Sequence, residues 1–278
     1  MSEHSFATAR ASAERTPGAA PNDLNRVWWE SLPMTYAPWE QQERTPVTVA
    51  DFQRLEADFL HNNPWLRDRF DFTTFRDKDV LEIGCGAGAA SCLFAQQGAR
   101  VTAIDLTEAA VDLARRNAAL RGLSIDVRRG DAETLDRPDA SADFVFSWGV
   151  LHHTSDTARA VSEVVRVLRP GGRGLIMVYH RHSLRYVGKG LYWLLVKGRL
   201  LRGDSMASVQ RFFTDGYYHR HFTAGDLSHM LAGAGLSVRT TTVTHMAKRM
   251  VPRIPERLDA WLKARSGWLL VAEFEKPI

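Results

Sequence analysis

Val80-Leu81-Glu82-Ile83-Gly84-Cys85-Gly86-Ala87-Gly88 is the stretch that decides the fold class of this 278-residue chain. Its first four residues form an apolar run interrupted by one acid, which is typical of a buried strand with a single polar position. Glycines follow at alternate positions, and residues 89–95 then have the composition of a helix. A strand, a glycine-rich turn and a helix N-terminus predict a corner that binds a nucleotide, because glycine lets a ligand lie directly against the backbone.

The spacing within the turn distinguishes between ligands. The dinucleotide fingerprint is G-x-G-x-x-G, whereas residues 82–88 read E-x-G-x-G-x-G. An acid at a strand end suits a cationic amino group better than a diphosphate, and the pattern resembles the first motif of the class I S-adenosylmethionine (SAM) methyltransferases. Glu82 has two possible roles, a structural hydrogen bond and an indirect contact with the ligand's amino group, and the two are compatible. The turn residues expected to contact the cofactor are Glu82, Gly84, Cys85, Gly86 and Gly88.

Composition limits the other function classes. Apolar residues make up 45% of the chain, enough for a full core, and no run approaches the roughly 20 apolar residues of a membrane span. No basic stretch followed by an apolar one opens the chain, so we expect no signal peptide and a cytoplasmic location. Cys85 and Cys92 are the only cysteines, and without a Cys/His cluster we predict neither a disulfide nor a metal site. A formal net charge of +4 without a dense Lys/Arg tract predicts no nucleic-acid partner.

Strands and helices alternate through the middle of the chain. Expected strands are 79–83, 101–104, 124–128, 142–147 and 174–179, and expected helices are 89–97, 107–121 and 155–168. Such alternation with buried apolar strands predicts an α/β fold, a Rossmann-like doubly wound sheet that is mostly parallel and covered on both faces. The predicted division of the chain is a disordered tail (1–22), an N-terminal helical lid (23–70), a cofactor-binding core (71–180), a helical and aromatic substrate insert (181–226) and the C-terminal part of the sheet (227–278).

Two segments outside the core have open interpretations. The aromatic-rich residues 26–39 either pack on the core or form a lid whose rings face a sulfonium. Residues 184–202 are apolar with interspersed Lys and Arg, which favours an amphipathic helix that forms a wall of the acceptor pocket. Contact with a membrane surface, without stable insertion, is the alternative.

The residues that follow each strand are candidates for ligand binding, because ligands of an open parallel sheet bind at the carboxyl ends of its strands. Asp105 is placed to accept from both ribose hydroxyls and Asp131 from the adenine amino group. A helix cap and a turn are the structural alternatives for these two acids. The candidates after the second, third and fourth strands are Asp105, Leu106, Asp131, Ala132, Ser147, Trp148 and Gly149.

The order of the motifs strengthens the resemblance. After the glycine turn and Asp105 come Gly130-Asp131-Ala132, Val150-Leu151-His152-His153-Thr154 and Leu168-Arg169-Pro170-Gly171-Gly172. In this order and spacing, residues 70–180 closely resemble the ubiquinone/menaquinone C-methyltransferase-like group of SAM methyltransferases. The resemblance implies a seven-stranded sheet with its last strand antiparallel, SAM as cofactor and S-adenosylhomocysteine as product. It does not fix the substrate.

Methyl transfer from a sulfonium mainly requires proximity, alignment and exclusion of water. A base is needed only when the acceptor arrives protonated, and histidine fits that task near pH 7. Among the histidines on strand ends and in the insert we rank His153 and His221 first, with Tyr218 beside them. The alternative is that these histidines pack in the core or cap a helix.

The sequence therefore predicts a SAM-dependent methyltransferase that acts by O-, N- or C-methylation on a small organic acceptor of aromatic or lipophilic character, in secondary or cofactor metabolism. It leaves the acceptor and the choice between monomer and homodimer open. Two alternative functions remain: a nicotinamide-dependent oxidoreductase, and a SAM-binding protein that does not transfer methyl. Residues 147–150 read Ser-Trp-Gly-Val where nucleic-acid amino-methyltransferases carry an Asn/Asp-Pro-Pro-aromatic tetrad, which supports a small-molecule acceptor.

Overall fold

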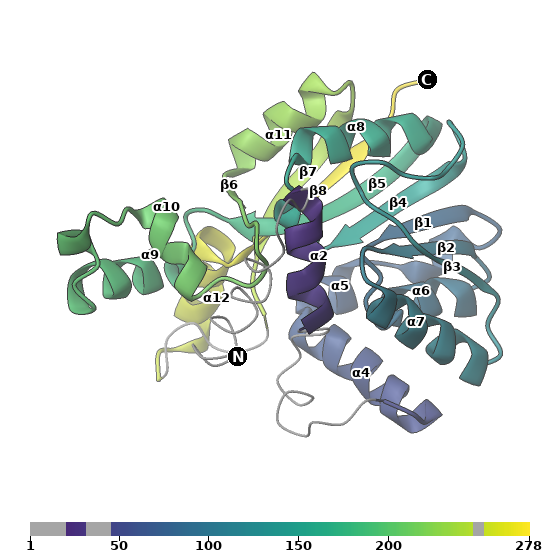
Figure 1. The fold of residues 1–278 in the computed structure, drawn as a ribbon. Coiled ribbons are helices and arrows are strands. Elements are labelled where there is room, and N and C mark those ends of the chain that lie inside the picture. Colours follow the sequence, from purple (N-terminus) through teal and green to yellow (C-terminus); the bar gives the residue numbers. More distant parts are fainter. Residues whose placement is uncertain (1–20, 32–45, 247–252) are drawn as a thin grey trace.

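A single sheet forms the centre of the protein (Figure 1). The computed structural model describes residues 21–31, 46–246 and 253–278. The strand order is β3-β2-β1-β4-β5-β8-β7, in which only β8 runs antiparallel to its neighbours. The predicted Rossmann-like sheet with an antiparallel last strand is confirmed, and one short additional strand, β6, pairs with the end of β5. The strands are β1 (Asp79–Ile83), β2 (Arg100–Asp105), β3 (Ile125–Arg129), β4 (Ala142–Trp148), β5 (Leu168–His180), β6 (His221–Phe222), β7 (Ser237–Thr244) and β8 (Leu269–Glu275).

Helices cover both faces of the sheet, with α8 and α11 on one face and α4 to α7 on the other (Figure 1). Most begin at a residue whose side chain accepts from a backbone amide of the first turn, as Thr107 does at α7 and Asp156 at α8. The helices are α2 (Pro21–Ser31), α4 (Val49–Asn62), α5 (Pro64–Arg69), α6 (Ala89–Gln96), α7 (Glu108–Leu120), α8 (Thr157–Val167), α9 (Leu184–Leu191), α10 (Met206–Val209), α11 (Ala224–Gly233) and α12 (Glu256–Ser266).

The inner strands supply two hydrophobic cores because successive side chains of a strand point to opposite faces. Leu81 and Val145 pack on the side of α8 and α11. Val80 and Phe146 pack on the opposite side, against the aromatic ring of Phe94 in α6. Each fully buried large side chain contributes about 1.5–3 kcal/mol of transfer free energy, so the strands are fixed from both faces and their carboxyl ends form a rigid edge.

Two predicted element boundaries are wrong. The strand expected from residue 174 begins at Leu168, because Leu168 already pairs with Ala142 of β4 before a register shift. The helix expected over 184–202 is broken: α9 ends at Leu191, a π-helical turn follows over Tyr192–Val196, and a 3₁₀ turn over Leu200–Arg202. Gly198 interrupts this segment with a backbone φ of +65° that favours glycine.

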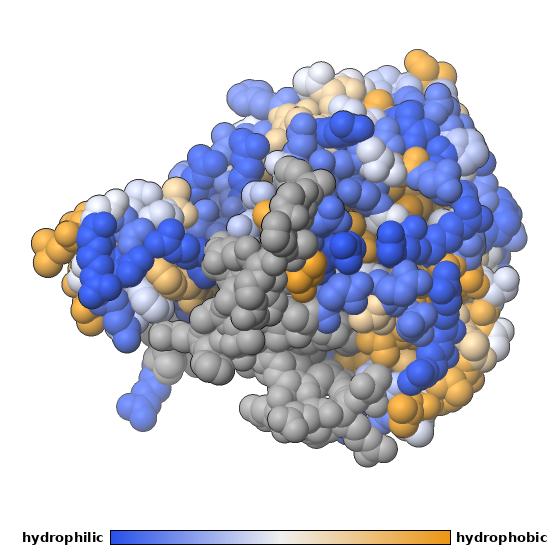
Figure 2. Space-filling view, viewed as in Figure 1, coloured by the Kyte–Doolittle hydropathy of each residue, from blue (hydrophilic) through white to orange (hydrophobic). Residues whose placement is uncertain are grey.

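The segment from α9 to α10 forms an arm that projects from the sheet (Figure 1). Figure 2 shows hydrophobic residues at the tip of this arm, where Leu195, Val196 and Leu201 are exposed. In the part of the chain that the structure describes, none of the helices has the length and apolar character needed to cross a membrane.

Helix α2 lies across the carboxyl ends of the central strands (Figure 1). It begins at Pro21, two residues inside the segment 1–22 that we expected to be a disordered tail. Residues 1–20 of that tail and residues 32–39 of the predicted aromatic cluster lie outside the described residues. Within α2, Trp28 is fully buried, so this part of the predicted N-terminal lid packs on the core and also covers the strand ends.

Candidate active site

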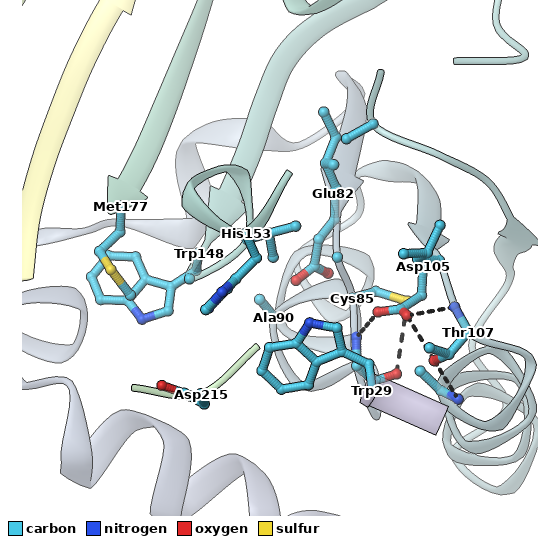
Figure 3. A pocket seen from close by; sticks show the side chains of 18 of the residues that line it. Trp29, Glu82, Cys85, Ala90, Asp105, Thr107, Trp148, His153, Met177 and Asp215 are labelled. Carbon is cyan, nitrogen blue, oxygen red and sulfur yellow. Dashed lines mark hydrogen bonds between the residues drawn. The ribbon is translucent and has the colours of Figure 1, made fainter. Parts of the chain in front are cut away.

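A cavity of about 520 Å³ lies at the carboxyl ends of β1, β2, β4 and β5. Figure 3 shows Met177, Trp148 and His153 on one side of it, Glu82 and Asp105 on the other, and Trp29 between the two groups. One end of the cavity, the cofactor end, is bounded by the glycine turn and the acids that follow β2 and β3. The other, the acceptor end, is lined by Trp148, Met177, Tyr179, Arg185, Lys189, Asp215 and Trp268.

Most of the residues predicted to contact the cofactor line this cavity. Two do not. Gly88 is the N-cap of α6, and its backbone faces Ala114 rather than the cavity. The side chain of Ser147 is fully buried among the strands. The predicted residues that do line the cavity are Glu82, Gly84, Cys85, Gly86, Asp105, Leu106, Asp131, Ala132, Trp148 and Gly149.

The glycine turn is anchored to the neighbouring strand and open toward the cavity. The backbone amides of Gly84 and Cys85 donate to the carbonyl oxygen of Ile104, at 2.7 and 3.0 Å. Gly86 has a φ of +52°, and a Cβ atom added there would meet no heavy atom within 4 Å. Any side chain at this position would therefore occupy cavity space, and the missing Cβ leaves room for a ligand against the backbone.

Two carboxyl groups line the cofactor end, that of Glu82 buried and that of Asp105 partly buried. Glu82 accepts a short hydrogen bond from the Ser91 hydroxyl, and burial raises the pKa of Glu82 to about 8. Asp105 accepts from the Gly86 amide at 3.0 Å, and from the amide and hydroxyl of Thr107 at 3.0 and 2.9 Å. Burial raises the pKa of Asp105 as well. Both acids are therefore more costly to ionise than in water, and a nearby cationic group would favour their charged forms.

Asp131 is tied to helix α2. Its carboxylate accepts from the Glu133 backbone amide at 2.9 Å, which is the turn interaction that we considered as the alternative role. It also accepts from the side-chain amide of Asn22 at 2.8 Å. Sequence reasoning missed Asn22 because nothing in the local pattern shows that α2 crosses the end of β3.

His153 lines the cavity and carries one unprotonated ring nitrogen. Its Nδ1 lies 3.0 Å from the carbonyl oxygen of Tyr218, and since a carbonyl only accepts, Nδ1 carries the hydrogen and donates. In the neutral ring Nε2 then keeps a lone pair, and this buried atom has no hydrogen-bond partner among the described residues. Burial lowers the pKa of His153, while the charge of Asp215 and the bond to Tyr218 oppose that shift. The ring is therefore neutral near pH 7 and able to accept a proton.

The structure does not bring the side chains of His221 and Tyr218 to the cavity lining. His221 lies in β6, where its ring stacks on Tyr186 with 4.1 Å between centroids, and burial lowers its pKa to about 3. Tyr218 contributes its carbonyl oxygen, which orients His153. Of the three residues that the sequence ranked as catalytic candidates, only His153 faces the cavity.

The acceptor end contains residues that sequence reasoning did not select as site residues. The hydroxyl of Tyr179 donates to the carboxylate of Asp215, at 3.0 and 3.1 Å to its two oxygens. The ring of Tyr179 stacks on Trp268 with a centroid distance of 4.7 Å. Trp29 of α2 lies 5.1 Å from the His153 ring in an edge-on arrangement. Aromatic rings therefore form much of the wall on which an acceptor would lie.

Comparisons with known proteins agree with this geometry. Residues 81–176 match the methyltransferase domain family. The chain is 38% identical over 208 residues to the ubiquinone biosynthesis O-methyltransferase of Methylocella silvestris, covering 74% of this chain and 78% of that protein. The chain belongs to the SAM-dependent methyltransferases. SAM is its cofactor, and the nicotinamide-dependent oxidoreductase that the sequence left open is set aside.

Solved structures with low sequence identity support the fold. A SAM-dependent methyltransferase from Mesorhizobium loti is 22% identical, with a TM-score of 0.53 over 77% of this chain and 96% of that chain. The [4+2]-cyclase SpnF is 20% identical, with a TM-score of 0.53 over 80% of this chain and 81% of that chain. Because a cyclase shares the architecture, the residues of the site rather than the fold must identify the reaction of this methyltransferase.

Proposed function

We propose that this enzyme methylates a hydroxyl oxygen of a small aromatic acceptor, with His153 as the general base. The observation that carries the proposal is that His153 lines the cavity while its buried Nε2 has no hydrogen-bond partner among the described residues. The similarity to a protein named as an O-methyltransferase supports oxygen as the acceptor atom. An oxygen acceptor needs a base because its hydroxyl is protonated at neutral pH.

The cofactor end fits SAM. The open backbone at Gly86 leaves room for the ligand, and the carboxyl of Glu82 provides a counter-charge for its amino group. Asp105 retains acceptor capacity beyond its bonds to Gly86 and Thr107, which suits the two ribose hydroxyls. Asp131 would accept from the adenine amino group. The cofactor supplies a methyl group on a cationic sulfur, which is a good leaving group.

The residues of the chain then handle the proton and the alignment. His153 Nε2 takes the hydroxyl proton of the acceptor as the acceptor oxygen forms its bond to the methyl carbon and the carbon–sulfur bond breaks. Bound SAM would supply the methyl group and leave as a neutral thioether, so a methyl ether would result while His153 holds the proton. The carbonyl of Tyr218 holds Nδ1 throughout, and the carboxylate of Asp215 stabilises the imidazolium that forms.

The acceptor end suits a flat, apolar body. Trp148 is held by a hydrogen bond from its Nε1 to the side-chain oxygen of Asn63 at 3.2 Å, so its ring has a fixed orientation. Together with Met177, Tyr179 and Trp268 it forms a wall of aromatic and sulfur-containing side chains. Such a wall favours stacking with an aromatic ring.

The test is transfer of labelled methyl from SAM to a panel of simple phenols. We expect His153→Gln to lower kcat by about 100-fold to 10,000-fold, the usual contribution of a general base, with SAM affinity unchanged. In the wild type kcat/KM should fall as the pH drops below 6.5 through the lowered pKa of His153, and the variant should lose this dependence. His182→Gln is the matched control, since His182 is exposed and does not line the cavity.

Two results would contradict the proposal. If His153→Gln keeps wild-type turnover across pH, His153 is not the base. If SAM binds but no phenol is methylated, the protein binds the cofactor for another purpose, which is the alternative that the sequence left open.

A further inference from the structure

We propose that the acceptor carries an anionic group, a carboxylate or a group of similar charge, which Arg185 binds at the acceptor end of the cavity with Lys189 beside it. This inference rests on the proposed function for the position of the reacting hydroxyl. It adds the chemical class of the substrate and the residue that determines specificity. Neither cation belongs to the cofactor end.

Both cations come from one face of helix α9. Arg185 and Lys189 are four residues apart, and side chains at this spacing are neighbours on a helix. Both line the cavity. The adjacent positions Tyr186 and Gly190 are buried against the rest of the arm, and Ser183 fixes the start of the helix by accepting from the Tyr186 amide at 3.1 Å. The packing of α9 therefore sets the side from which the two cations reach the cavity.

The guanidinium of Arg185 contacts a tryptophan ring and has no acidic partner in the part of the chain that the structure describes. Its central carbon lies 3.7 Å from the ring centroid of Trp268, a cation–π contact that engages the face of the guanidinium. Within the described ranges no aspartate or glutamate forms an ion pair with Arg185. By contrast, Arg181 pairs with Asp226 and Arg199 pairs with Asp204. The donors at the edge of the Arg185 guanidinium can therefore bind a carboxylate in bidentate fashion.

A row of aromatic rings, one pair stacked and the next edge-on, connects this cation to the base. Trp268, which carries the guanidinium, stacks on Tyr179, and the Tyr179 ring lies 5.5 Å from the His153 ring. An aromatic acceptor lying along this row would place its anionic group at Arg185 and its hydroxyl at His153. Asp215, the acid at this end, accepts a hydrogen bond from Tyr179, and its charge raises the pKa of His153. Asp215 therefore interacts with the proposed base and not with Arg185.

A matched pair of probes separates charge from shape. 4-Hydroxybenzoate and 4-hydroxybenzamide have nearly the same size and carry the same phenol, but only the first is an anion. Calorimetric titration into the protein saturated with S-adenosylhomocysteine measures binding without turnover. We expect the acid to bind about 10-fold more tightly or better, because a hydrogen-bonded charged pair is typically worth a factor of that order. The preference should weaken at high salt.

Variants assign the preference to one residue. Arg185→Gln should reduce acid binding to the level of the amide, and Lys189→Gln should reduce it less. Arg265→Gln is the control, because Arg265 also lies over a tryptophan ring, at 4.7 Å from the Trp261 centroid, but does not line the cavity. Arg265→Gln therefore removes one positive charge and one cation–π contact, as Arg185→Gln does, but away from the cavity.

The outcomes distinguish this inference from the proposed function. Equal binding of acid and amide, absence of acid binding, or an acid preference that survives in Arg185→Gln would each overturn the anionic acceptor. Methylation of the amide with the same kcat/KM as the acid would also overturn it, and would leave methyl transfer intact. Acid binding that depends on Arg185 without methylation of any phenol would sustain the inference and refute O-methylation.

Discussion

Replacement of Gly216 by alanine should reduce turnover by acting on His153. Gly216 has a φ of +83°, and a Cβ atom added there would lie 2.4 Å from His153 Nδ1 and 2.9 Å from the Tyr218 carbonyl oxygen. A contact at 2.4 Å is about 1 Å inside ordinary van der Waals separation, so the ring must move by roughly that distance. A displacement of about 1 Å at a catalytic group lowers the rate by about 100-fold, or about 2.7 kcal/mol in activation free energy.

Gly203→Ala is a control for the backbone strain. Gly203 has a φ of +82°, close to that of Gly216, and an added Cβ would meet nothing within 4 Å. Both variants should lose about 1–2 kcal/mol of stability from the left-handed conformation, measured by urea unfolding. Only Gly216→Ala should lower kcat, with SAM affinity unchanged in calorimetry. Equal values of kcat in the two variants would refute the view that Gly216 makes room for the orientation of His153.

Three further predictions concern charge and the position of α2. Because the pKa of Glu82 is raised to about 8, SAM binding at pH 7 should release close to one proton as the carboxyl ionises. Calorimetry in buffers of different ionisation enthalpy should show this release, and Glu82→Gln should abolish it. The pKa of His221 is lowered from 6.5 to about 3, so between these pH values the unfolded chain binds a proton that the folded chain does not, and the free energy of unfolding decreases as the pH is lowered. By pH 5 the loss from His221 is about 2 kcal/mol. His221→Phe should reduce the measured decrease between pH 7 and pH 5 by that amount. The side chain of Asn25 donates to the His153 carbonyl at 2.6 Å and accepts from the Tyr217 amide at 3.1 Å. Asn25→Ala should therefore lower the free energy of unfolding by about 1–3 kcal/mol and make α2 sensitive to protease. Unchanged protection of α2 from protease would contradict the role of Asn25 as its anchor.

The cofactor end could be predicted from the sequence because its parts are local. The glycine turn, Asp105 and Asp131 each follow directly after a strand, and the parallel order of the strands brings their carboxyl ends together. Pattern and fold class together thus locate these residues without knowledge of any long-range contact. The exceptions, Gly88 and Ser147, are also local in origin, since one caps a helix and the other falls on the buried side of β4.

The choice between His153 and His221 could not be made in this way. His153 follows a predicted strand, His221 lies in the predicted insert, and both are buried. What separates them is that β6 pairs with the end of β5, which turns His221 toward Tyr186, while the loop at Gly216 and Tyr218 folds back onto His153. These contacts join residues about 35 to 65 positions apart in the chain, and no local pattern encodes them.

The acceptor end depends even more on tertiary packing. Trp268 reaches Tyr179 because β8 inserts between β5 and β7 in the sheet. Arg185 reaches Trp268 because α9 begins soon after β5, whose last residue, His180, donates its backbone amide to the carbonyl of Trp268. The basic and apolar character of residues 184–202 was visible in the sequence, but the side from which its cations face the cavity was not.

The two ends of the cavity carry different ionisable groups, carboxyl groups at one end and cations at the other, and this division constrains the orientation of the ligands. The acids Glu82 and Asp105 line the cofactor end, and the cations Arg185 and Lys189 line the acceptor end. A cationic cofactor favours ionisation of the carboxyl groups at one end, and an anionic acceptor is attracted to the cations at the other, so binding in the reversed orientation is disfavoured. His153 lies between the two groups and stays neutral because it is buried. His153 therefore stays unprotonated until it takes the proton of the acceptor. Because Arg185→Gln removes a cation that binds the acceptor and leaves His153 in place, it should raise KM for an anionic acceptor more than it lowers kcat.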